Sequence, residues 1–457
     1  MDEVKIPMEN LQQDSRRQWL EPIWLRAWQW MTGQQSPPTQ PDGSTTNPVR
    51  RCHKVPEKLG HDVDLKSYYE PSVVSIGPYH HGKAELQQVE SLKDTAATLF
   101  IRMAGSDNTM EYTVGLVDKF VADIKGVRNW YDLTERGIEE EDFIRMMFLD
   151  GCFIIMFISC FISSGFKEMG MTKDTISLVQ QDIFKLENQL PFVVLEALCT
   201  DRFKISDLFW MLDRYICYCT IGSNRHFQKG IEHEAQPLHL LDLLRKRWVG
   251  KENFEDHFSK FNHNFIVERI MTSRLVRNVK ELTTSGIFLK PNSSNLLSDI
   301  HCSYFLTGNL TLPPMVIDGS TKTIFLNAIA HEACTRNHFG FTSFVCFLDS
   351  LIDNADDVKE MRSAGVLQNF LGSDEEVASL FNQIGAVLEP EIDNYTHVKL
   401  QIGSYLASKG RTKVATWLAE VIRYRFRNPL TTVAVIVGFL AIFLTALLFL
   451  QSDSRPF

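Results

Sequence analysis

From Leu430 to Leu450 the chain reads LTTVAVIVGFLAIFLTALLFL, and this stretch sets its architecture. It contains no charged residue, and 14 of its 21 positions are Leu, Ile, Val or Phe. At a rise of about 1.5 Å per residue, an α-helix of this length spans about 31 Å, close to the hydrocarbon core of a bilayer. Asn428 can cap this helix, and Pro429 suits its first turn, where a missing N–H costs nothing. The sequence therefore predicts a single C-terminal transmembrane helix, followed by a short tail at 451–457.

The charges that flank this segment predict its orientation. Arg423, Arg425 and Arg427 precede it, whereas Arg455 on the far side is offset by Asp453. Because basic flanks stay in the cytosol, we expect a tail-anchored protein with a cytosolic body, in either the plasma membrane or an endomembrane. The chain also holds three glycosylation tripeptides, which begin at Asn292, Asn309 and Asn394. These would be used only if the body lay outside the cytosol.

Charge is spread unevenly along the chain. The formal net charge is -9; from residue 409 onward, seven Lys and Arg stand against two acidic residues, a net of +5, which leaves -14 for residues 1–408. An acidic body argues against general nucleic-acid binding, since phosphate affinity needs clustered Lys and Arg. The nine cysteines follow no repeated CxxC pattern. Several, such as Cys152 and Cys160, stand in apolar runs, as expected of reduced cytosolic thiols.

Ahead of the membrane segment, the chain divides into three parts. Residues 1–31 hold four of the eight tryptophans, which suit contact with the body or with a lipid surface. Residues 32–48 are rich in Pro, Gln, Ser and Thr and predict a flexible linker. Residues 49–427 predict one large, mainly α domain with few short strands, expected around Val73–Ile76 and Met315–Ile317.

Several segments of this domain have the spacing of amphipathic helices. In residues 84–105, the predicted apolar face consists of Leu92, Ala96, Leu99 and Met103. Ser373 and Glu376 predict a capping box for a helix that stops at Gly385. Further amphipathic helices are expected to start at His239 and at Thr396.

A second apolar run, GCFIIMFISCFISSG, covers residues 151–165. Its length falls short of the roughly 18 residues that a membrane span needs, so we expect a fully buried core helix. Four acidic residues, Glu139 to Asp142, stand near its beginning, where a helix dipole favours negative charge. The alternative is a channel-like oligomer in which this run adds membrane contact.

GPYHHGKA resembles a phosphate-binding loop, because Gly77 to Lys83 fits G-x-x-x-x-G-K after an extended stretch. Three features count against this function. Ala84 replaces the hydroxyl that would ligate magnesium, Pro78 removes an amide N–H, and bulky side chains stand where phosphate approaches closely. A structural turn is the favoured interpretation. A nucleotide-dependent switch or enzyme that uses Gly77, Gly82 and Lys83 is the alternative.

HEACTRNH places His331, Cys334 and His338 on one helical face. The zinc-protease pattern H-E-x-x-H fails, because Thr335 stands where the second His belongs, and no fourth ligand can be named. No G-x-S-x-G, GxGxxG, kinase-loop or calcium-loop pattern occurs. The sequence therefore predicts neither a metal site, nor a cofactor, nor an enzyme activity.

Three polar residues interrupt an apolar stretch near the middle of the chain. LENQLPFVVLEAL, from Leu186, places Glu187, Asn188 and Gln189 ahead of Pro191. Because buried polar groups are hydrogen-bonded, we expect this cluster to tie helix ends together, with a ligand pocket as the alternative.

Taken in order, these segments resemble one known family. They are KVPEKL, YEPSVVSIGPYHHGK with the helix through Lys93, DGCFII from Asp150, LENQLPF, HLLDLLR, TSGIFLK, the stretch around LIDNADDV, and Asn-Pro before the terminal apolar helix. From about 50 to 450, the chain is similar to family 247 of the plant domains of unknown function, also called the UPF0481 type. It departs from the usual family pattern at Met156, Lys185, His331, Ala333 and Leu430.

The resemblance implies a membrane-associated, α-rich plant protein without an established enzyme activity. Some grass relatives act as pollen-side determinants of self-incompatibility, which implies a role in recognition. We therefore expect a membrane-anchored protein-interaction or signalling module. Its expected partners are the bilayer and another protein, and its oligomeric state stays open.

Overall fold

A computed structural model describes most of the predicted domain. The described residues are 52–60, 65–105, 110–134, 137–220, 236–250, 278–305, 307–335, 339–386, 388 and 395–407, with six positions between 437 and 445. Outside them lie residues 1–51, the tail, Asn394, Arg423, Arg425, Arg427 and most of the membrane segment, Leu430 and Leu450 included. The fold is mainly α with few strands, as predicted.

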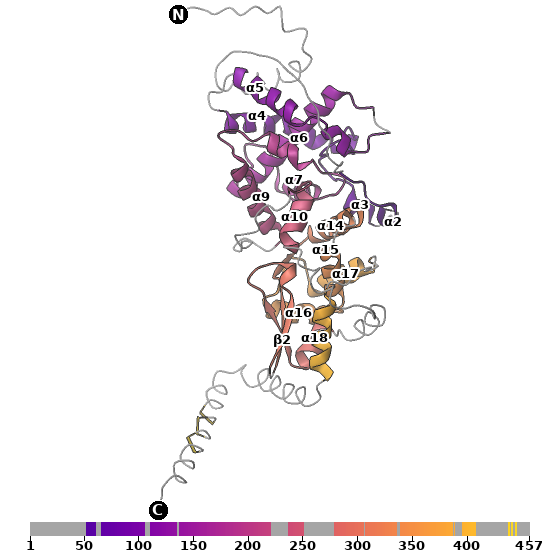
Figure 1. Cartoon of the computed structure of the whole chain (residues 1–457), viewed down its shortest axis with the longest axis vertical. Helices are drawn as coiled ribbons and strands as arrows, with labels where there is room; N and C mark the ends of the chain where they lie inside the picture. Colours follow the sequence, from indigo (N-terminus) through magenta and orange to yellow (C-terminus); the bar gives the residue numbers. More distant parts are fainter. Residues whose placement is uncertain are drawn as a thin grey trace, which may run out of the picture.

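In the first half of the chain, the described regular elements are all helical. Its elements are α2 (Glu57–Gly60), α3 (Lys66–Tyr69), η2 (Ala84–Leu86), α4 (Gln87–Ala104), α5 (Met110–Asp123), η3 (Val127–Trp130), α6 (Glu140–Ser163), α7 (Lys173–Asp182), α8 (Phe192–Ala197), α9 (Ile205–Thr220) and α10 (Leu240–Val249). In Figure 1 the helices α4, α5 and α6 gather at one end of an elongated body, and α10 lies near its middle.

The second half mixes helices with short strands. Its elements are α13 (Val279–Thr284), β1 (Ile287–Pro291), η4 (Leu297–Asp299), β2 (His301–Tyr304), β3 (Gly308–Leu312), β4 (Met315–Ile317), α14 (Thr321–Thr335), α15 (Gly340–Asp349), α16 (Ala355–Ser363), β5 (Leu367–Asn369), α17 (Asp374–Gly385, with the predicted stop) and α18 (Thr396–Ala407). Figure 1 shows β2 and α18 together at the end of the body opposite α5.

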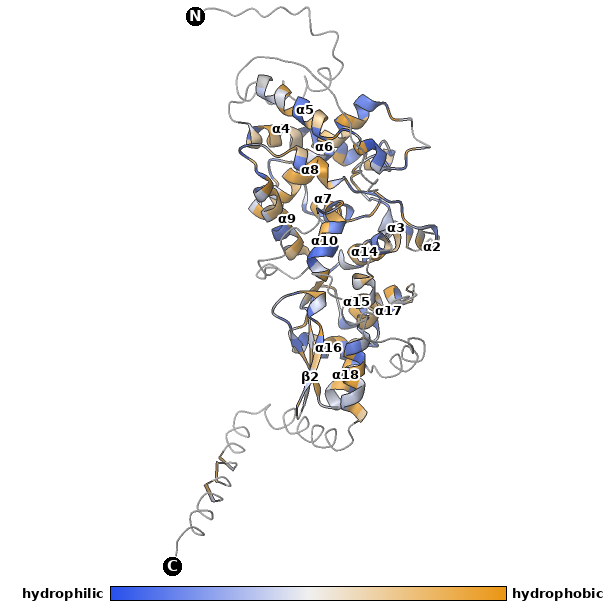
Figure 2. Cartoon of the chain, in the orientation of Figure 1, coloured by the Kyte–Doolittle hydropathy of each residue, from blue (hydrophilic) through white to orange (hydrophobic). Residues whose placement is uncertain are grey.

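The long helix α6 is the centre of the first half. Most of its residues from Phe143 to Cys160 are buried, and it packs against α4, α8 and α9. Figure 2 colours much of α6 and the neighbouring α8 as hydrophobic. The prediction of a buried core helix is thus confirmed for the first two-thirds of the run, whereas Ser163 and Ser164 at its end are exposed. The helix starts ahead of the apolar run because Glu140, Glu141 and Asp142 fill its first turn, where the dipole favours negative charge.

Among the described residues, α6 is also the one helix long and apolar enough to cross a membrane, and most of that window is buried in the body. Of the predicted C-terminal span, the structure describes helical positions such as Val437 and Leu444, whose side chains are exposed. There the hydroxyl of Thr445 donates a hydrogen bond to the carbonyl of Ala441 at 2.6 Å. The membrane span itself stays a prediction.

Helix α4 buries a broader face than the predicted one. Ala96 and Leu99 of the predicted face are buried, and Leu92 and Met103 are half-buried and pack against the core. The buried face also includes Lys93, whose ammonium lies 2.6 Å from a carboxylate oxygen of Asp150 on α6. Periodicity counts apolar residues alone, so it misses a face that contains a buried cation.

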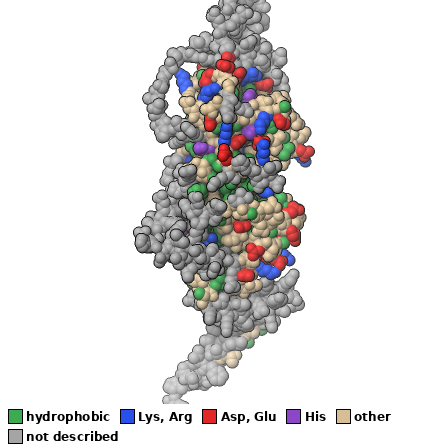
Figure 3. Space-filling model, turned by 90° about the vertical axis from the view of Figure 1, so that its right-hand side faces the viewer, with side chains coloured by type: hydrophobic (Ala, Val, Ile, Leu, Met, Phe, Trp, Pro, Cys, Tyr) green, Lys and Arg blue, Asp and Glu red, His purple; other side chains and the backbone are tan. Residues whose placement is uncertain are grey.

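The outer surface is charged in both signs on the face that Figure 3 shows. Acidic and basic side chains are interspersed over the coloured part of this face. All nine cysteines of the chain are free thiols, and most of them are buried. Both features suit the reduced, acidic body that the composition predicts.

Short strands occur in the second half. β1, β3 and β2 form a sheet in this order, with β1 parallel and β2 antiparallel to β3. β4 pairs in parallel with β5, which confirms the extended stretch predicted at Met315–Ile317. The other predicted stretch, Val73–Ile76, joins no sheet, because side chains and not a second strand bond its backbone.

Two predicted helix starts are confirmed. α10 begins directly after His239, which caps it, and α18 begins at Thr396. α17 follows Ser373, whose hydroxyl accepts a hydrogen bond from the amide of Glu376. The predicted capping box is incomplete, because the Glu376 carboxylate accepts from the amide of Gly372 and not from that of Ser373.

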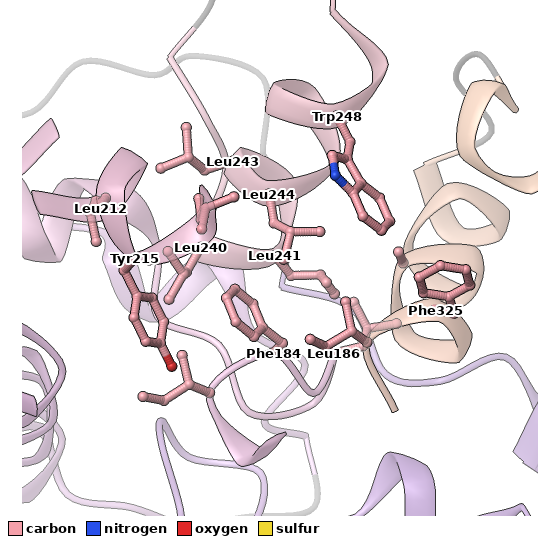
Figure 4. Close-up of a cluster of buried hydrophobic side chains, with 14 of the residues drawn as sticks. Phe184, Leu186, Leu212, Tyr215, Leu240, Leu241, Leu243, Leu244, Trp248 and Phe325 are labelled. Atoms are coloured by element: carbon pink, nitrogen blue, oxygen red, sulfur yellow. The ribbon is translucent and has the colours of Figure 1, made fainter. Parts of the chain in front are cut away.

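Helix α10 joins the two halves through one hydrophobic cluster. Figure 4 shows side chains of α9, α10, α14 and the stretch before α8 facing one another. Trp248 of α10 meets Phe325 of α14 edge-on at 5.4 Å between ring centroids, and Phe184 stacks on Tyr215 of α9 at 5.8 Å. The core is therefore continuous along the body.

Close packing of α6 on α8 makes Gly151 sensitive to substitution. A Cβ at this position would lie 2.7 Å from Leu198 Cδ1 and 3.5 Å from Val194 Cγ1. Gly151→Leu should lower the free energy of unfolding by about 1–3 kcal/mol or more, because overpacking displaces both helices. The matched control is Gly115→Leu in α5, where an added Cβ meets nothing within 4 Å. Urea denaturation of both variants measures the difference; equal stabilities would contradict the packing.

Candidate functional site

Seven buried or half-buried polar side chains enclose the extended segment 70–80. We call this set the polar frame; its members are Lys93, Asp150, Asp182, Lys185, Glu187, Asn188 and Gln189. They come from α4, α6, the end of α7 and the LENQLPF stretch, so segments far apart in sequence meet here. The predicted cluster Glu187, Asn188 and Gln189 lies within the frame.

Asp182 is the anchor of the segment's first half. Its carboxylate accepts hydrogen bonds from the amides of Ser72, Val73 and Val74 at 2.8–3.1 Å. Lys185 balances this buried charge, with its ammonium 3.0 Å from Asp182 Oδ1, and also donates to the carbonyl of Glu70. A carboxylate that accepts several amides binds each about twice as strongly as a neutral acceptor.

Asn188 and Gln189 bond the backbone on both sides. Asn188 Oδ1 accepts from the amide of Ile76 at 2.6 Å, and its Nδ2 donates to the carbonyl of Val74 at 3.1 Å. Gln189 Nε2 donates to the carbonyls at the end of α7, while its Oε1 accepts from the amide of Leu241 in α10 at 3.0 Å. The expectation that these residues tie helix ends together is thereby confirmed.

The ion pair of Lys93 and Asp150 completes the frame. Asp150 Oδ2 accepts from the amide of Gly77 at 2.7 Å, and Lys93 Nζ donates to the carbonyl of Ser75 at 2.6 Å. Burial alone would lower the pKa of Lys93, but the carboxylates of Asp150 and Glu90 outweigh it and raise the pKa. Burial raises the pKa of Asp150, against the ammonium of Lys93 and the amide of Gly77, which lower it. Both side chains of the pair are almost completely shielded from solvent.

The phosphate-loop lookalike is part of this frame. The amide of Gly77 donates to a carboxylate, Asp150, and the ammonium of Lys83 lies 3.6 Å from Glu70. Gly77 and Gly82 have positive φ angles of 71° and 82°, and the short η2 follows the loop. The two glycines thus allow the chain to turn. Because the amide of Gly77 already donates to the Asp150 carboxylate, this geometry gives no support to phosphate binding.

Tyr79 and His80 connect the turn at residues 77–83 to the first described residues, Cys52 and Val55. The Tyr79 hydroxyl donates to the carbonyl of Cys52 at 2.7 Å, and burial raises the pKa of Tyr79 to about 12. His80 Nε2 lies 3.0 Å from Glu187 Oε2, and Glu187 Oε1 accepts from the amide of Val55. Burial would raise the pKa of Glu187, but the bonds from His80 and Val55 lower it.

A second buried polar centre joins α10 to α14. Asp242 Oδ1 lies 3.2 Å from His331 Nε2, and its Oδ2 lies 2.9 Å from the ammonium of Lys246. His239 stands 4.8 Å from His331 between ring centroids. Burial and then the neighbouring His331 hold the pKa of His239 well below its usual value. Within this centre, His239 Nε2 and His331 Nδ1 have no hydrogen-bond partner.

Glu332 is the other charge of this centre, and it is fully buried. It pairs with Arg245 at 2.7 Å and accepts from the amides of Phe341 and Thr342 at the start of α15. Asn327, one turn earlier on α14, accepts from the amide of Leu186 at 2.8 Å. α14 thereby joins the second half of the chain to the polar frame.

The metal-type residues of the HEACTRNH stretch do not converge. His331 pairs with Asp242, while Cys334 Sγ donates to the carbonyl of Lys54 at 3.4 Å. His338 lies outside the described residues. Across the described parts of the chain, no group of three or more His, Cys, Asp or Glu side chains is placed to hold a metal ion.

The glycosylation tripeptides are poorly placed for modification of the folded body. Asn292 is 5% exposed, and its Nδ2 donates to the carbonyl of Leu296 at 2.9 Å. Asn309 lies half-buried in β3, the central strand, between Phe288 and Ser303. Neither side-chain amide is freely accessible, so their use is a weak indicator of topology.

One open groove, of about 500 Å³, lies between the start of α16 and α17. It is lined by Asp353, Asn354, Ala355, Glu375, Ala378, Ser379, Asn382, Gln383 and Ala386. These residues include no His, Lys or Arg, so the groove offers neither a base that titrates near neutral pH nor a cation for phosphate. It does not resemble a catalytic site.

Three exposed side chains form a line along α9. Trp210, Arg214 and Tyr218 are spaced by four residues and therefore share one face of the helix. Trp210 is 60% exposed and Tyr218 is 50% exposed. The guanidinium of Arg214 lies 5.8 Å from the Trp210 ring centroid, and Tyr218 meets Phe161 of α6 edge-on at 4.8 Å. We call these three residues the α9 strip.

Sequence reasoning missed most charged members of these centres. Lys185 stands between Phe184 and Leu186, and Lys93 between Leu92 and Asp94; periodicity treats both lysines as solvent-facing. Asp182 is the last residue of α7, and nothing in its sequence neighbourhood indicates burial. Its role becomes clear only in the structure, where it accepts the amides of residues 72–74. The one usable signal was Asp150, a charge that directly precedes a long apolar run.

Comparison with known proteins gives one family. The family model DUF247, described as a plant protein of unknown function, matches residues 52–444. A UPF0481 protein of Arabidopsis thaliana is 28% identical over 352 residues, 71% of this chain and 70% of the relative. A putative UPF0481 protein of the same plant is 22% identical over 405 residues, 69% of this chain and 74% of the relative. No solved structure matches.

Removal of Lys93 should expose the cost of an unpaired buried carboxylate. Lys93→Met leaves Asp150 without its cation and should lower the free energy of unfolding by about 3–5 kcal/mol. The double variant Lys93→Met with Asp150→Asn should recover part of this loss. The control Lys119→Met breaks an exposed pair with Asp123 and should cost less than about 1 kcal/mol. Denaturant unfolding decides; equal losses in the two single variants would contradict a buried pair.

The low pKa of His239 makes stability depend on pH. His239 stays neutral when folded but takes up a proton when unfolded below its usual pKa of 6.5. Stability is therefore present above pH 6.5 and falls below it, by up to about 1.4 kcal/mol per pH unit. His239→Asn keeps an N-cap acceptor for α10 and should flatten this dependence between pH 7 and pH 5.

The control for this experiment is His301→Asn, because that side chain is 51% exposed. It should leave the pH dependence of the unfolding free energy unchanged. Unfolding midpoints measured at several pH values compare the two variants with the parent chain. An unchanged slope in His239→Asn would refute the assignment.

Proposed function

Because this chain belongs to the DUF247 family of plant proteins of unknown function, we propose that it is a membrane-anchored protein-interaction module. In this proposal the α9 strip binds the partner protein, and the C-terminal helix holds the body at a membrane. The observation that carries the proposal is the exposure of Trp210, Arg214 and Tyr218 on one rigid helix face.

The α9 strip has the composition of a binding hot spot. Trp, Tyr and Arg are the residues that most often dominate the binding energy of protein interfaces. The opposite face of α9 is buried through Leu208, Leu212 and Ile216, so the helix cannot turn its aromatic side chains inward. A surface whose side chains already have the orientation needed for binding loses little conformational entropy when the partner binds.

Membrane anchoring is proposed from the segment Leu430–Leu450 and its basic flank. A helix of this length and composition is favourable in a bilayer by several kcal/mol on a scale of roughly 0.3–0.6 kcal/mol per large apolar residue. The hydroxyl of Thr445 is satisfied by Ala441 within its own helix, which suits a medium without water. The basic flank of Arg423, Arg425 and Arg427 supports a cytosolic body, because basic flanks tend to stay on the cytosolic side.

The two alternatives have less support. A channel-like oligomer would use the apolar run of α6, but that run is buried against α4, α8 and α9. A nucleotide-dependent switch would need free amides at Gly77–Lys83, and the amide of Gly77 donates to Asp150. The groove between α16 and α17 is lined by no His, Lys or Arg that could bind a nucleotide phosphate.

A single substitution gives a sharp test of topology. Asp132 is exposed and precedes Leu133 and Thr134, so Asp132→Asn creates an accessible glycosylation tripeptide. With a cytosolic body, this variant should show no glycan when expressed in plant cells. The positive control is the same variant behind a cleavable secretory signal, which should gain one glycan. A glycan on the variant without that signal, removed by an endoglycosidase, would overturn the cytosolic topology.

Loss of the α9 strip should abolish partner binding without unfolding the body. The double variant Trp210→Ala and Tyr218→Ala should lower partner recovery by about tenfold or more, since a hot-spot aromatic contributes about 2 kcal/mol or more. The matched control is Phe370→Ala, which removes an aromatic that is 69% exposed on another element. Quantitative affinity capture from plant membranes, with unfolding curves of each variant, measures the effect. Equal recovery by all three chains would refute the α9 strip as the binding surface.

A further inference from the structure

We propose that the tip of the β2–β3 hairpin, with Tyr304 and Phe305, contacts the lipid surface beside the membrane helix. This inference rests on the proposed membrane anchoring and adds a second, peripheral contact between the body and the bilayer. It fixes which end of the body faces the membrane.

The hairpin tip is apolar and open to solvent. Phe305 is 84% exposed, more than any other large hydrophobic side chain in the described parts of the chain. Its amide donates to the carbonyl of Thr307 at 3.2 Å, which closes the turn. An apolar tip of this kind needs an apolar environment to contribute binding energy.

The tip lies beside the helix from which the chain continues to the membrane. Tyr304 of β2 packs on Tyr405 of α18 at 5.6 Å between ring centroids. The amide of Cys302 donates to Gln401 Oε1 of the same helix at 3.3 Å. Because Tyr405 is two residues before the end of α18, the tip and that end are neighbours. Figure 1 shows β2 and α18 together at one end of the body.

Charge draws this end of the body toward a membrane. Residues 409–427 carry six Lys and Arg against Glu420, and each basic residue near an anionic leaflet contributes about 1 kcal/mol of attraction. The described residues at the tip end of the sheet, Thr284, Ser285 and Thr307, are uncharged, so they offer no anion to repel lipid headgroups. Tyr and Phe are the side chains that settle at the membrane interface.

The 22 residues between Ala407 and Leu430 allow this contact. As a helix they would span about 33 Å, and fully extended about 75 Å. The body can therefore lie with its hairpin on the membrane while the C-terminal helix crosses it. The alternative, a body held away from the surface, would leave Phe305 in water.

Lipid photo-crosslinking of the full chain tests the contact. Phe305 is replaced by p-benzoylphenylalanine, and the protein is placed in vesicles of phosphatidylcholine and phosphatidylserine. Because Phe305 is exposed, the larger ring displaces no core residue. After illumination, mass spectrometry counts lipid adducts on the hairpin peptide. The matched control carries the same probe at Trp210, an exposed aromatic on α9.

The expected result is about tenfold more lipid adduct at Phe305 than at Trp210, in line with the transfer of one aromatic side chain from water. Co-flotation of the protein with the vesicles reports the anchor separately. Co-flotation with equal, low adduct at both positions would overturn the hairpin contact and leave the anchor standing. Adducts to a second protein chain at Phe305 would also overturn it, in favour of a protein partner. Failure to co-float would refute the anchoring, and this inference with it.

Discussion

Residues 72–77 run from the exposed Ser72 into the interior of the body without pairing with a described strand, so their amides need acceptors from elsewhere. The carboxylate of Asp182 takes three of these amides, Asn188 takes a fourth, and Asp150 takes that of Gly77. Each carboxylate then needs a cation in a dry interior. Lys185 and Lys93 supply it at 3.0 and 2.6 Å. The most unusual side chains of the core thus follow from one requirement, the satisfaction of a single buried segment of backbone.

The same residues also hold the halves of the chain together. The side chain of Gln189 donates to a carbonyl at the end of α7 and accepts from the amide of Leu241 in α10. The side chain of Asn327 accepts from the amide of Leu186 and donates to the carbonyl of Tyr68. α10 and α14 in turn share the centre around Asp242. Such a polar network specifies one packing arrangement more strictly than apolar contacts do, because any shift breaks hydrogen bonds between buried groups. The body should therefore behave as one rigid support for whatever its surface binds.

Much of this fold could be predicted from residues that act locally, and little of it from residues that act at long range. The helix start at His239, the stop at Gly385 and the burial of most of 151–165 follow from neighbours a few positions away, so the sequence reveals them. The polar cluster at Glu187–Gln189 was correctly predicted to tie helix ends, since polar side chains in an apolar stretch must find partners. Their partners were not predictable, because Asn188 and Ile76 lie 112 residues apart. For the same reason the predicted face of α4 was incomplete, as its buried residue Lys93 is explained only by Asp150 on another helix.

The distribution of polar groups between core and surface bears on function. Every charged member of the polar frame has a partner that fixes the backbone, so these groups are committed to structure and are shielded from substrate. The exposed features are of another kind: the α9 strip on one side of the body, and the hairpin tip next to α18. Figure 1 places α9 well away from the end that carries β2 and α18. If that end faces the bilayer, a partner can reach the α9 strip without competing with lipid. The hydrogen-bonded network between the two surfaces then determines the distance of the α9 strip from the membrane and its orientation relative to the membrane.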